Sequence, residues 1–359
     1  MRNIYFTPGP AELYFTVEGH IKNALKEQVP SISHRSKTFQ NIYQEAVSNL
    51  KEVLNVPDSY HVFFTGSATE IWERIIQNCV EHKSYHYVNG AFSERFKATA
   101  EELGKKVGAS VVEEGSCVVP DPSQITPDTE LIAFTLNETS TGASQPLEDI
   151  YTIQSAYPDK LIVVDAVSIL PHSQIDYTKV DSVFFSVQKA FGLPSGLGVW
   201  IVSPRSIEKA QQLADKGLSI GSYHSLPSLL SKGEKNQTPE TPNVLNIYLL
   251  AKVCADMLNK GMDKIRQETE YKAALMYHAI EQHSSLFPFV KDIAYRSKTV
   301  IVAETKAPSS EIIDALKKDS LIIGSGYGTN KSKHIRIANF PTHSKEQFEL
   351  LVDKINVLN

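Results

Sequence analysis

Short apolar segments of strand length alternate with longer helical patterns through the first two-thirds of the chain, and this alternation constrains the fold most. Helical patterns at residues 69–80 and 93–106 separate several of these segments. Apolar strands that alternate with helices form a mostly parallel sheet covered on both faces. The chain is therefore expected to contain a large α/β domain. Its predicted strands are residues 61–65, 85–88, 131–135, 161–165, 182–186 and 199–202.

The pattern changes after about residue 204. A helix is predicted at residues 204–217, and residues 219–242 form a long stretch rich in Ser, Gly and Pro. A loop of that length in a compact protein is usually functional or packed against a partner. The segments that follow are predicted as helices at 246–260 and 262–285, a strand at 299–303, a helix at 309–317, strands at 321–323 and 334–338, and a helix at 344–358.

Two domains are expected from this change of pattern, and 359 residues are enough for both. The large α/β domain would span residues 17–255 and would bind the ligand. A small α+β domain would span residues 256–359 together with residues 1–16. The predicted architecture is therefore a large, mostly parallel sheet closed by a smaller C-terminal domain.

The charge and the cysteines exclude several classes of partner. The formal net charge is -5 and no block of basic residues stands out, so no nucleic acid and no membrane surface is expected as a partner. The apolar runs are too short to span a bilayer, and the N-terminus lacks a signal-peptide pattern. The three cysteines lie far apart without metal-ligand spacing, which predicts reduced thiols, no metal and a cytoplasmic location.

Open parallel sheets bind ligands beyond the carboxyl ends of their strands, so the residues at these ends are candidates for a site. Gly66-Ser67-Ala68-Thr69 follows the strand at 61–65 and precedes a helix, whose N-terminus could bind an anion. The same turn could serve only as a helix N-cap, through Ser67 or Thr69. Asp165 ends the strand at 161–165, where it could bind a metal, orient a histidine, pair with a ring nitrogen or cap a turn.

Lys189 lies just beyond the strand at 182–186 and before a glycine-rich turn. An amine near apolar walls loses part of its affinity for the proton and becomes a nucleophile towards carbonyl groups. A lysine and a carboxylate at neighbouring strand ends match the pattern of sites for pyridoxal 5′-phosphate (PLP). The residue pair therefore indicates a PLP enzyme.

The order of these motifs resembles that of the class V aminotransferases of fold type I over essentially the whole chain. Within the family the chain is most similar to phosphoserine aminotransferases and to their alanine–glyoxylate or serine–pyruvate relatives. The Gln188-Lys189 pair resembles that of the aminotransferases, whereas desulfurases and kynureninases usually carry His-Lys. The resemblance implies that PLP is bound through Lys189 and that Asp165 holds the proton of its pyridine nitrogen.

The resemblance also assigns the other cofactor contacts. It implies that Ala68 and Thr69 bind the cofactor phosphate and that Phe92 stacks on the cofactor ring, although ordinary core packing would also explain Phe92. Thr139, in the NETSTG segment at residues 137–142, matches a threonine beside the phenolic oxygen, and Gln188 belongs to the same cofactor set.

The segment QTPET at residues 237–241 resembles a family segment, Asn-Thr-Pro-Pro-Thr, that reaches the cofactor phosphate of the neighbouring subunit. Gln237 replaces the family's Asn, and Glu240 replaces its second Pro, while Thr238 is retained. The resemblance thus implies a homodimer with shared active sites.

On the substrate side, Arg336 matches the family arginine that binds the α-carboxylate, a task suited to a guanidinium fork. His34 and Arg35 match a pair that meets the side-chain anion of glutamate or phosphoserine, although Arg35 could also be a surface charge. Phosphoserine enzymes commonly carry a second His-Arg pair, where this chain reads GSGYG at residues 324–328. The cations at the substrate phosphate are therefore fewer than expected, unless Lys331 or Lys333 substitutes.

The expected activity is transamination between phosphoserine and 2-oxoglutarate in serine biosynthesis. The alternative is a serine or alanine transaminase that uses glyoxylate or pyruvate, and the sequence leaves the donor and acceptor open. A desulfurase would need a late cysteine, and none follows Cys254. A nicotinamide dehydrogenase would need a Gly-x-Gly-x-x-Gly turn, which the early strands lack. A non-catalytic scaffold of this fold has no need to retain Lys189, Asp165 and Arg336 together.

Overall fold

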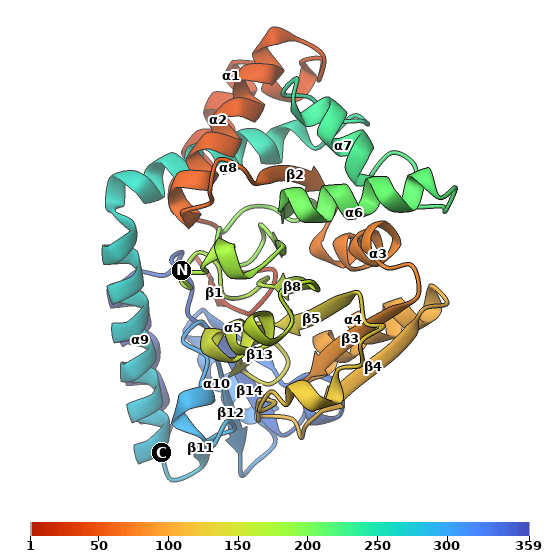
Figure 1. The fold of residues 1–359 in the computed structure, drawn as a ribbon. Helices are drawn as coiled ribbons and strands as arrows, with labels where there is room; N and C mark the ends of the chain where they lie inside the picture. The colour runs from red at the N-terminus through yellow and green to blue at the C-terminus, as the bar shows by residue number, and fades with distance from the viewer. Residues whose placement is uncertain (1, 359) are drawn as a thin grey trace.

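A computed structural model describes residues 2–358 and contains one large sheet, one small sheet and a two-stranded sheet of β6 (Asn137–Glu138) and β7 (Ala143–Ser144) (Figure 1). The large sheet has seven strands in the order β2-β10-β9-β8-β5-β3-β4. Within it β10 is antiparallel to both neighbours, whereas the pairs from β9 to β4 are parallel. The predicted mostly parallel sheet is confirmed. Its strands are β2 (His61–Thr65), β3 (Lys83–Val88), β4 (Lys106–Val111), β5 (Leu131–Thr135), β8 (Leu161–Asp165), β9 (Ser182–Ser186) and β10 (Gly198–Val202).

Helices cover both faces of this sheet, because successive side chains of its central strands alternate between two apolar layers. Phe184 lies in the layer that contains Trp72 and Trp200, whereas its neighbour Phe185 lies in the layer of α2 and α8. The first layer packs on α3 (Ala68–Cys79), α4 (Ala91–Glu102), α6 (Pro204–Asp215) and α7 (Leu226–Gly233). The second packs on α1 (Val17–Lys26), α2 (Lys37–Leu54), α5 (Leu147–Ala156) and α8 (Val244–Lys260).

The small sheet has five strands in the order β1-β13-β14-β12-β11. Its edge strand β1 (Ile4–Phe6) comes from the N-terminus and pairs in parallel with β13 (Leu321–Ser325). The N-terminal segment therefore packs with the C-terminal part of the chain, as the expected grouping of residues 1–16 requires. The other elements are α9 (Met262–Gln282), β11 (Leu286–Pro288), β12 (Val300–Thr305), α10 (Ser309–Lys318), β14 (His334–Ala338) and α11 (Lys345–Asn356).

The domain boundaries at residues 16 and 255 stay a prediction, and residues 1 and 359 of that division lie outside the described residues. The long helix α9 runs down one side of the molecule beside the small sheet (Figure 1). It contacts both α8 and α11, so it joins the layers on the two sheets. Because consecutive helices connect the two layers, no loop marks the predicted boundary at residue 255 in the sequence.

Two predicted segments differ from the structure. The helix predicted at 93–106 ends at Glu102, because Gly104 adopts a left-handed conformation (φ +74°) and Lys106 begins β4. That strand escaped prediction since it is a half-exposed edge strand without an apolar run. The stretch at 219–242, predicted as a loop, contains the helix α7, with Pro227 in its first turn.

Among residues 2–358, no helix is both long and apolar enough to cross a membrane. The three cysteines are free and buried. Burial raises the pKa of the Cys79, Cys117 and Cys254 thiols well above the usual range, which keeps them protonated. Reactive-thiol chemistry at these positions is therefore disfavoured.

Phe184→Ala should destabilise the large domain by about 3–5 kcal/mol, because it leaves a cavity beneath α3 at a fully buried position. Both tryptophans of the chain lie in the same layer, so tryptophan fluorescence during urea unfolding reports this change directly. Val111→Ala, at a 63% exposed position, is the control and should change stability by less than about 0.5 kcal/mol. Equal stability of the two variants would contradict the layer assignment.

Candidate active site

A cavity of about 250 Å³ lies at the carboxyl ends of β5, β8 and β9. Parallel strands direct their carboxyl ends to one edge of the sheet, so residues that are remote in sequence meet there. The N-terminal residues Gly9 and Pro10 also line the cavity. The structure brings seven of the predicted cofactor residues together in this lining: Ala68, Thr69, Phe92, Thr139, Asp165, Gln188 and Lys189.

Lys189 leaves the end of β9 and its Nζ donates a hydrogen bond to the Pro8 carbonyl oxygen. A Cβ atom on Gly9 would lie 2.2 Å from Nζ, and the φ of +144° at this position is strained for any other residue, so glycine lets the amine keep its place. Burial and the Arg336 guanidinium lower the pKa of Lys189 to about 8, although Asp165 and Glu138 act in the opposite direction. A substantial fraction of the amine is therefore neutral, and nucleophilic, near physiological pH.

Asp165 ends β8 and is only 2% exposed. Burial raises the pKa of its carboxyl to about 6, although hydrogen bonds from Val167 and Trp72 favour the carboxylate. The Val167 amide donates to Oδ1 at 3.1 Å, and Trp72 Nε1 donates to Oδ2 at 2.8 Å. Asp165 is thus a carboxylate at neutral pH, held in one orientation.

No motif in the sequence assigns a role to Trp72. It lies four residues after Ala68 on α3, so both side chains share one helix face, and both line the cavity. The spacing of four residues from a predicted site residue is the signal that could have identified it.

The turn before α3 does act as a helix N-cap, through Ser67, whose Oγ accepts from the Glu70 amide at 3.2 Å. The Ala68 amide donates to Ser186 Oγ at 2.8 Å, which ties the turn to the end of β9. The positive end of the helix dipole faces the cavity beside Ala68 and Thr69. The capping interpretation is correct, and it is compatible with anion binding at the same turn.

Glu138 is fully buried beside the cavity and was not assigned a role from the sequence. Its carboxylate accepts from the Phe92 and Ser93 amides at the N-terminus of α4, with the Ser93 amide 3.0 Å from Oε2. It also accepts from the Ser140 hydroxyl at 2.7 Å. Glu138 therefore fixes Phe92 relative to the turn that carries Thr139. Glu138 is a glutamate within the run of small polar residues at 137–142, and this pattern could have marked it as a site residue.

Polar atoms of the β5 end face the cavity. Thr139 donates to Ser168 Oγ at 2.8 Å, as does the Asn137 amide group at 2.8 Å. Thr135 Oγ1 and Asn137 Oδ1 are buried and have no hydrogen-bond partner within residues 2–358. Buried polar atoms are normally satisfied, so these two indicate that a polar ligand belongs in the cavity.

Arg336, on β14 of the small sheet, reaches the edge of this cavity. Its Nη1 donates to the Thr139 carbonyl at 3.2 Å and its Nε donates to the Ser325 carbonyl at 2.8 Å. The Tyr327 ring lies 5.4 Å from the guanidinium and 5.2 Å from the ring of Phe92. Tyr327 belongs to the GSGYG segment at residues 324–328, and the structure places its ring at the rim of the cavity.

The other predicted residues lie outside the cavity of their own chain. Arg35 donates to Gln237 Oε1 at 2.9 Å and to the Thr238 carbonyl at 2.7 Å. His34 adjoins this cluster, and burial and Arg35 lower the pKa of its imidazole. The structure therefore brings the predicted side-chain-anion pair and the predicted inter-subunit segment together, but neither of them lines the Lys189 cavity of the same chain.

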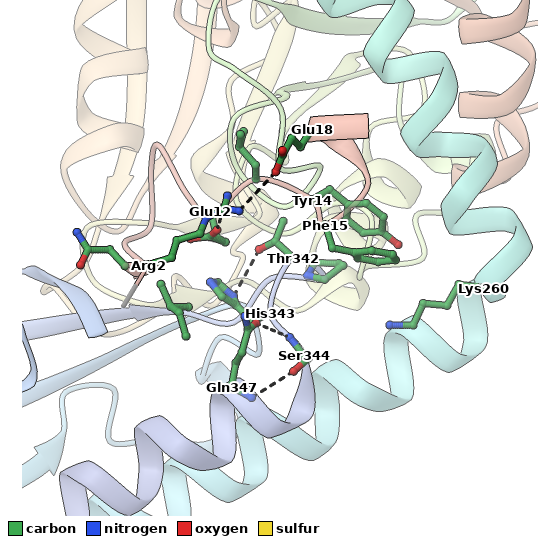
Figure 2. A pocket seen from close by; sticks show the side chains of 14 residues that line it. Arg2, Glu12, Tyr14, Phe15, Glu18, Lys260, Thr342, His343, Ser344 and Gln347 are labelled. Carbon is green, nitrogen blue, oxygen red and sulfur yellow. Dashed lines mark hydrogen bonds and ion pairs between the residues drawn. The ribbon is translucent and has the colours of Figure 1, made fainter. Parts of the chain in front are cut away.

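A second hollow of about 460 Å³ lies between the N-terminal segment and the start of α11 (Figure 2). Its wall includes Ser344 and Gln347, which form the capping box of α11, and Arg2, which lies 3.8 Å from carboxylate oxygens of Glu12 and Glu18. None of the predicted site residues lines it. It is larger than the Lys189 cavity but lacks a paired nucleophile and carboxylate.

Comparisons with known proteins agree with the geometry at the Lys189 cavity. A family model described as "Aminotransferase class-V" matches residues 9–339. A phosphoserine aminotransferase of Rhodococcus opacus is 28% identical over 332 residues, which cover 90% of this chain and 87% of that protein.

Two solved structures are similar in fold. A phosphoserine aminotransferase from Cytophaga hutchinsonii has a TM-score of 0.96 at 52% identity and covers 99% of this chain and 98% of its own. An alanine–glyoxylate aminotransferase from Nostoc sp. has a TM-score of 0.85 at 23% identity, covers 100% of this chain and 96% of its own, and supports the fold alone.

Asp165→Asn should lower the pKa of Lys189 below about 8, by about one unit, because it removes an opposite charge while keeping the shape of the side chain. The measurement is the pH dependence of Lys189 acylation in ligand-free protein, read by mass spectrometry of its peptide. Asp121→Asn, at an exposed position, is the control and should leave the midpoint unchanged. An unchanged midpoint in Asp165→Asn would show that the two side chains are not coupled.

Proposed function

The chain belongs to the class-V aminotransferase family, and we propose that it transfers the amino group of phosphoserine to 2-oxoglutarate. It is a PLP-dependent transaminase of fold type I. The observation that carries the proposal is the pairing of Lys189 and Asp165 across the cavity, with Arg336 at its edge. The phosphoserine assignment draws on the names of the relatives with the highest identities reported above. Transamination is reversible, and the reverse direction, in which glutamate donates the amino group, forms phosphoserine and would serve serine biosynthesis.

The cavity fits PLP on the basis of its own side chains. Lys189 would hold the cofactor aldehyde carbon, and Asp165 would hold the pyridine nitrogen. Ala68 and Thr69 would bind the phosphate at the N-terminus of α3, while Phe92 would lie against the ring. Thr139 and Gln188 would complete the polar lining. The unpartnered Thr135 Oγ1 and Asn137 Oδ1 support a polar ligand of this kind.

When bound, PLP supplies a conjugated ring that takes up the electron pair left when the Cα–H bond of an amino acid breaks. Lys189 Nζ would take the proton from Cα of the substrate and deliver it to the carbon that had carried the cofactor aldehyde, a task for which a pKa of about 8 is suited. Asp165 would keep the ring nitrogen protonated, because it remains a carboxylate at neutral pH. Trp72 holds that carboxylate in place.

Arg336 would orient the substrate through its α-carboxylate. Two of the five guanidinium N–H groups serve the Ser325 and Thr139 carbonyls, so others remain available for a carboxylate. Burial lowers the pKa of Arg336, yet the guanidinium stays charged at any physiological pH. Tyr327 at the rim would restrict the approach to this group.

The remaining predicted residues would act in a second copy of the chain, so the protein would be a homodimer. His34, Arg35, Gln237 and Thr238 gather in one cluster that does not line the cavity of its own chain. Arg35 uses part of its donors on Gln237 to Pro239, and the others could meet a substrate anion. Each active site would then combine Lys189 of one subunit with this cluster of its partner.

Three buried, protonated thiols suit a reducing compartment, and we place the protein in the cytoplasm. A serine or alanine transaminase that uses glyoxylate or pyruvate is the second candidate. It is favoured by the GSGYG segment, where Tyr327 stands in place of cationic side chains at the cavity rim.

Half-reactions test the substrate. Phosphoserine should convert the bound cofactor to its amine form at least about tenfold faster than serine does, because a phosphate gains charge-assisted hydrogen bonds of about 1.5–3 kcal/mol each. Arg35→Ala should remove most of this preference and leave alanine turnover nearly unchanged. Arg336→Ala should slow every amino acid alike, since all carry an α-carboxylate. The decay of the visible absorption band measures each rate.

Arg95→Ala is the control, because this arginine pairs only with Glu102 on the exposed side of α4 among the described ion pairs. It should keep the phosphoserine preference. Faster conversion by alanine or serine in the wild-type protein, with glyoxylate or pyruvate as the better acceptor, would favour the second candidate.

Subunit mixing tests the shared site. Lys189→Ala should abolish turnover, and Thr238→Ala should weaken it by impairing the site of the neighbouring subunit. A hybrid of the two has one site free of both lesions, so mixing should restore activity up to about a quarter of the wild-type value on statistical grounds. The assay is turnover after the subunits exchange under mild denaturant. Full activity in a protein that sediments as a monomer would exclude the shared site.

A further inference from the structure

The segment from Gln237 to Glu240 is held from two sides by charged groups of its own chain. On one side, Arg35 donates to the Thr238 carbonyl at 2.7 Å and to the Pro239 carbonyl at 3.2 Å. On the other side, His224 Nε2 lies 3.0 Å from Glu240 Oε2. Thr238 also donates to the Glu240 carbonyl at 2.7 Å, so the position of Glu240 affects that of Thr238.

His224 lies between two carboxylates and is only 3% exposed. Its Nδ1 forms a hydrogen bond with Glu70 Oε1, and its Nε2 meets Glu240 at ion-pair distance. The Tyr223 ring packs 4.1 Å from the imidazole ring and covers it. The contact therefore joins α3, the segment before α7 and the segment after it.

Glu70 extends this chain of contacts to the cavity. Its Oε2 accepts from the Gly66 amide at 2.8 Å, which closes the turn that precedes Ala68 and Thr69. Arg74 Nε lies 3.6 Å from Glu70 Oε1, one turn further along α3. The same carboxylate thus holds both the turn at the cavity and His224.

His224 is charged at neutral pH. Burial lowers the pKa of its imidazole, but the ion pair with Glu240 and the hydrogen bond and charge of Glu70 outweigh burial and raise the pKa to about 9. Burial by itself raises the pKa of Glu70. His224, the Gly66 amide and Arg74 lower that pKa by a larger amount, so it lies below its ordinary value and Glu70 remains a carboxylate.

Two other titratable groups lie close enough to Glu240 to feel its charge. Burial and the Glu240 charge raise the pKa of Tyr43, on α2, above the range in which it ionises. His34 has a lowered pKa, because burial and Arg35 outweigh the influence of Glu240. Neither group carries a compensating charge at neutral pH. Among residues 2–358, His224 is the cation at ion-pair distance from Glu240, while Arg35 contacts the neighbouring main-chain carbonyls.

We propose that Glu70, His224 and Glu240 form an ionic clip that positions the segment from Gln237 to Glu240 against the first turn of α3. The clip links the turn that lines the cavity of one chain to the segment that, in the proposed homodimer, enters the site of the other. Its three members are positioning residues, since none of them lines the Lys189 cavity. The link between the two sites rests on the proposed function, but the clip itself does not.

The pH dependence of the clip follows from the protonation of His224. Its folded pKa of about 9 exceeds the ordinary value of 6.5, so its stabilising effect is complete below pH 6.5 and is lost as the pH rises through about 9. The lowered pKa of Glu70 sets the acid limit, because that stabilisation is lost only as the pH falls below the usual carboxyl range. The clip is therefore closed at neutral pH.

Hydrogen exchange in the full-length protein tests the proposal, with the peptide that spans residues 234–240 followed by mass spectrometry, because the amide of Gln237 in it donates to the Lys232 carbonyl at 3.0 Å. After correction for intrinsic rates, its protection in the wild type should fall about tenfold between about pH 7 and about pH 10. His224→Gln, which keeps hydrogen-bond donors but removes the titrating charge, should lose this pH step. Glu240→Gln should shift the step to lower pH, because His224 keeps only one carboxylate.

His20→Gln is the matched control, because His20 Nε2 also pairs with a carboxylate, Asp256 Oδ2 at 2.7 Å, in another part of the large domain. It should keep the wild-type step. Persistence of the step in His224→Gln, or its absence in the wild type, would overturn the clip.

The release of PLP into ultrafiltrates separates this proposal from the proposed function. If the clip serves the neighbouring site, Glu240→Gln should release PLP about tenfold more readily and His20→Gln should not. Unchanged release, together with the expected exchange result, would overturn the link between the sites alone. A wild-type protein that holds PLP but ignores phosphoserine would overturn the proposed substrate and leave the exchange result as it is.

Discussion

Four charged side chains gather around one cavity, two of them buried (Asp165 and Glu138) and two partly buried (Lys189 and Arg336), and contacts from several parts of the structure hold them there. Lys189 and Arg336 are balanced by Asp165 and Glu138, so the cluster is neutral as a whole when all four are ionised. Taking a charge out of water is costly unless partners and hydrogen bonds replace the solvent. Each of the four therefore receives main-chain or indole groups: Pro8 for Lys189, Trp72 for Asp165, the first amides of α4 for Glu138, and two carbonyls for Arg336.

These partners come from both sheets and from the N-terminal segment, so the electrostatics of the site depend on how the parts pack. Arg336 belongs to the small sheet and helps lower the pKa of Lys189, which lies at the edge of the large sheet. Any movement that withdrew Arg336 would raise that pKa and protonate the amine more fully. The position of Arg336 in this structure thus favours the neutral, reactive form of Lys189.

The central strands and the site residues at their carboxyl ends could be predicted because their sequence signals are local. Each apolar run was long enough to mark a buried strand, and the edge at which parallel strands end follows from topology alone, which placed Asp165 and Lys189 together. Elements with weak local signals were missed or misjudged. The edge strand β4 has no apolar run, and α7 lies in a stretch whose Ser, Gly and Pro content is typical of loops.

The sequence by itself determined the central strands of the large sheet, their carboxyl ends and the residues that those ends present, because strand period and helix capping act over a few neighbouring positions. Only the tertiary structure decided which distant groups complete the site. Trp72 reaches Asp165 across 93 residues, and Arg35 meets Thr238 across 203, with no local pattern to announce either contact. The balance of charge was likewise decided in space, since the pKa of Lys189 or His224 depends on burial and on carboxylates that the fold brings from elsewhere in the chain.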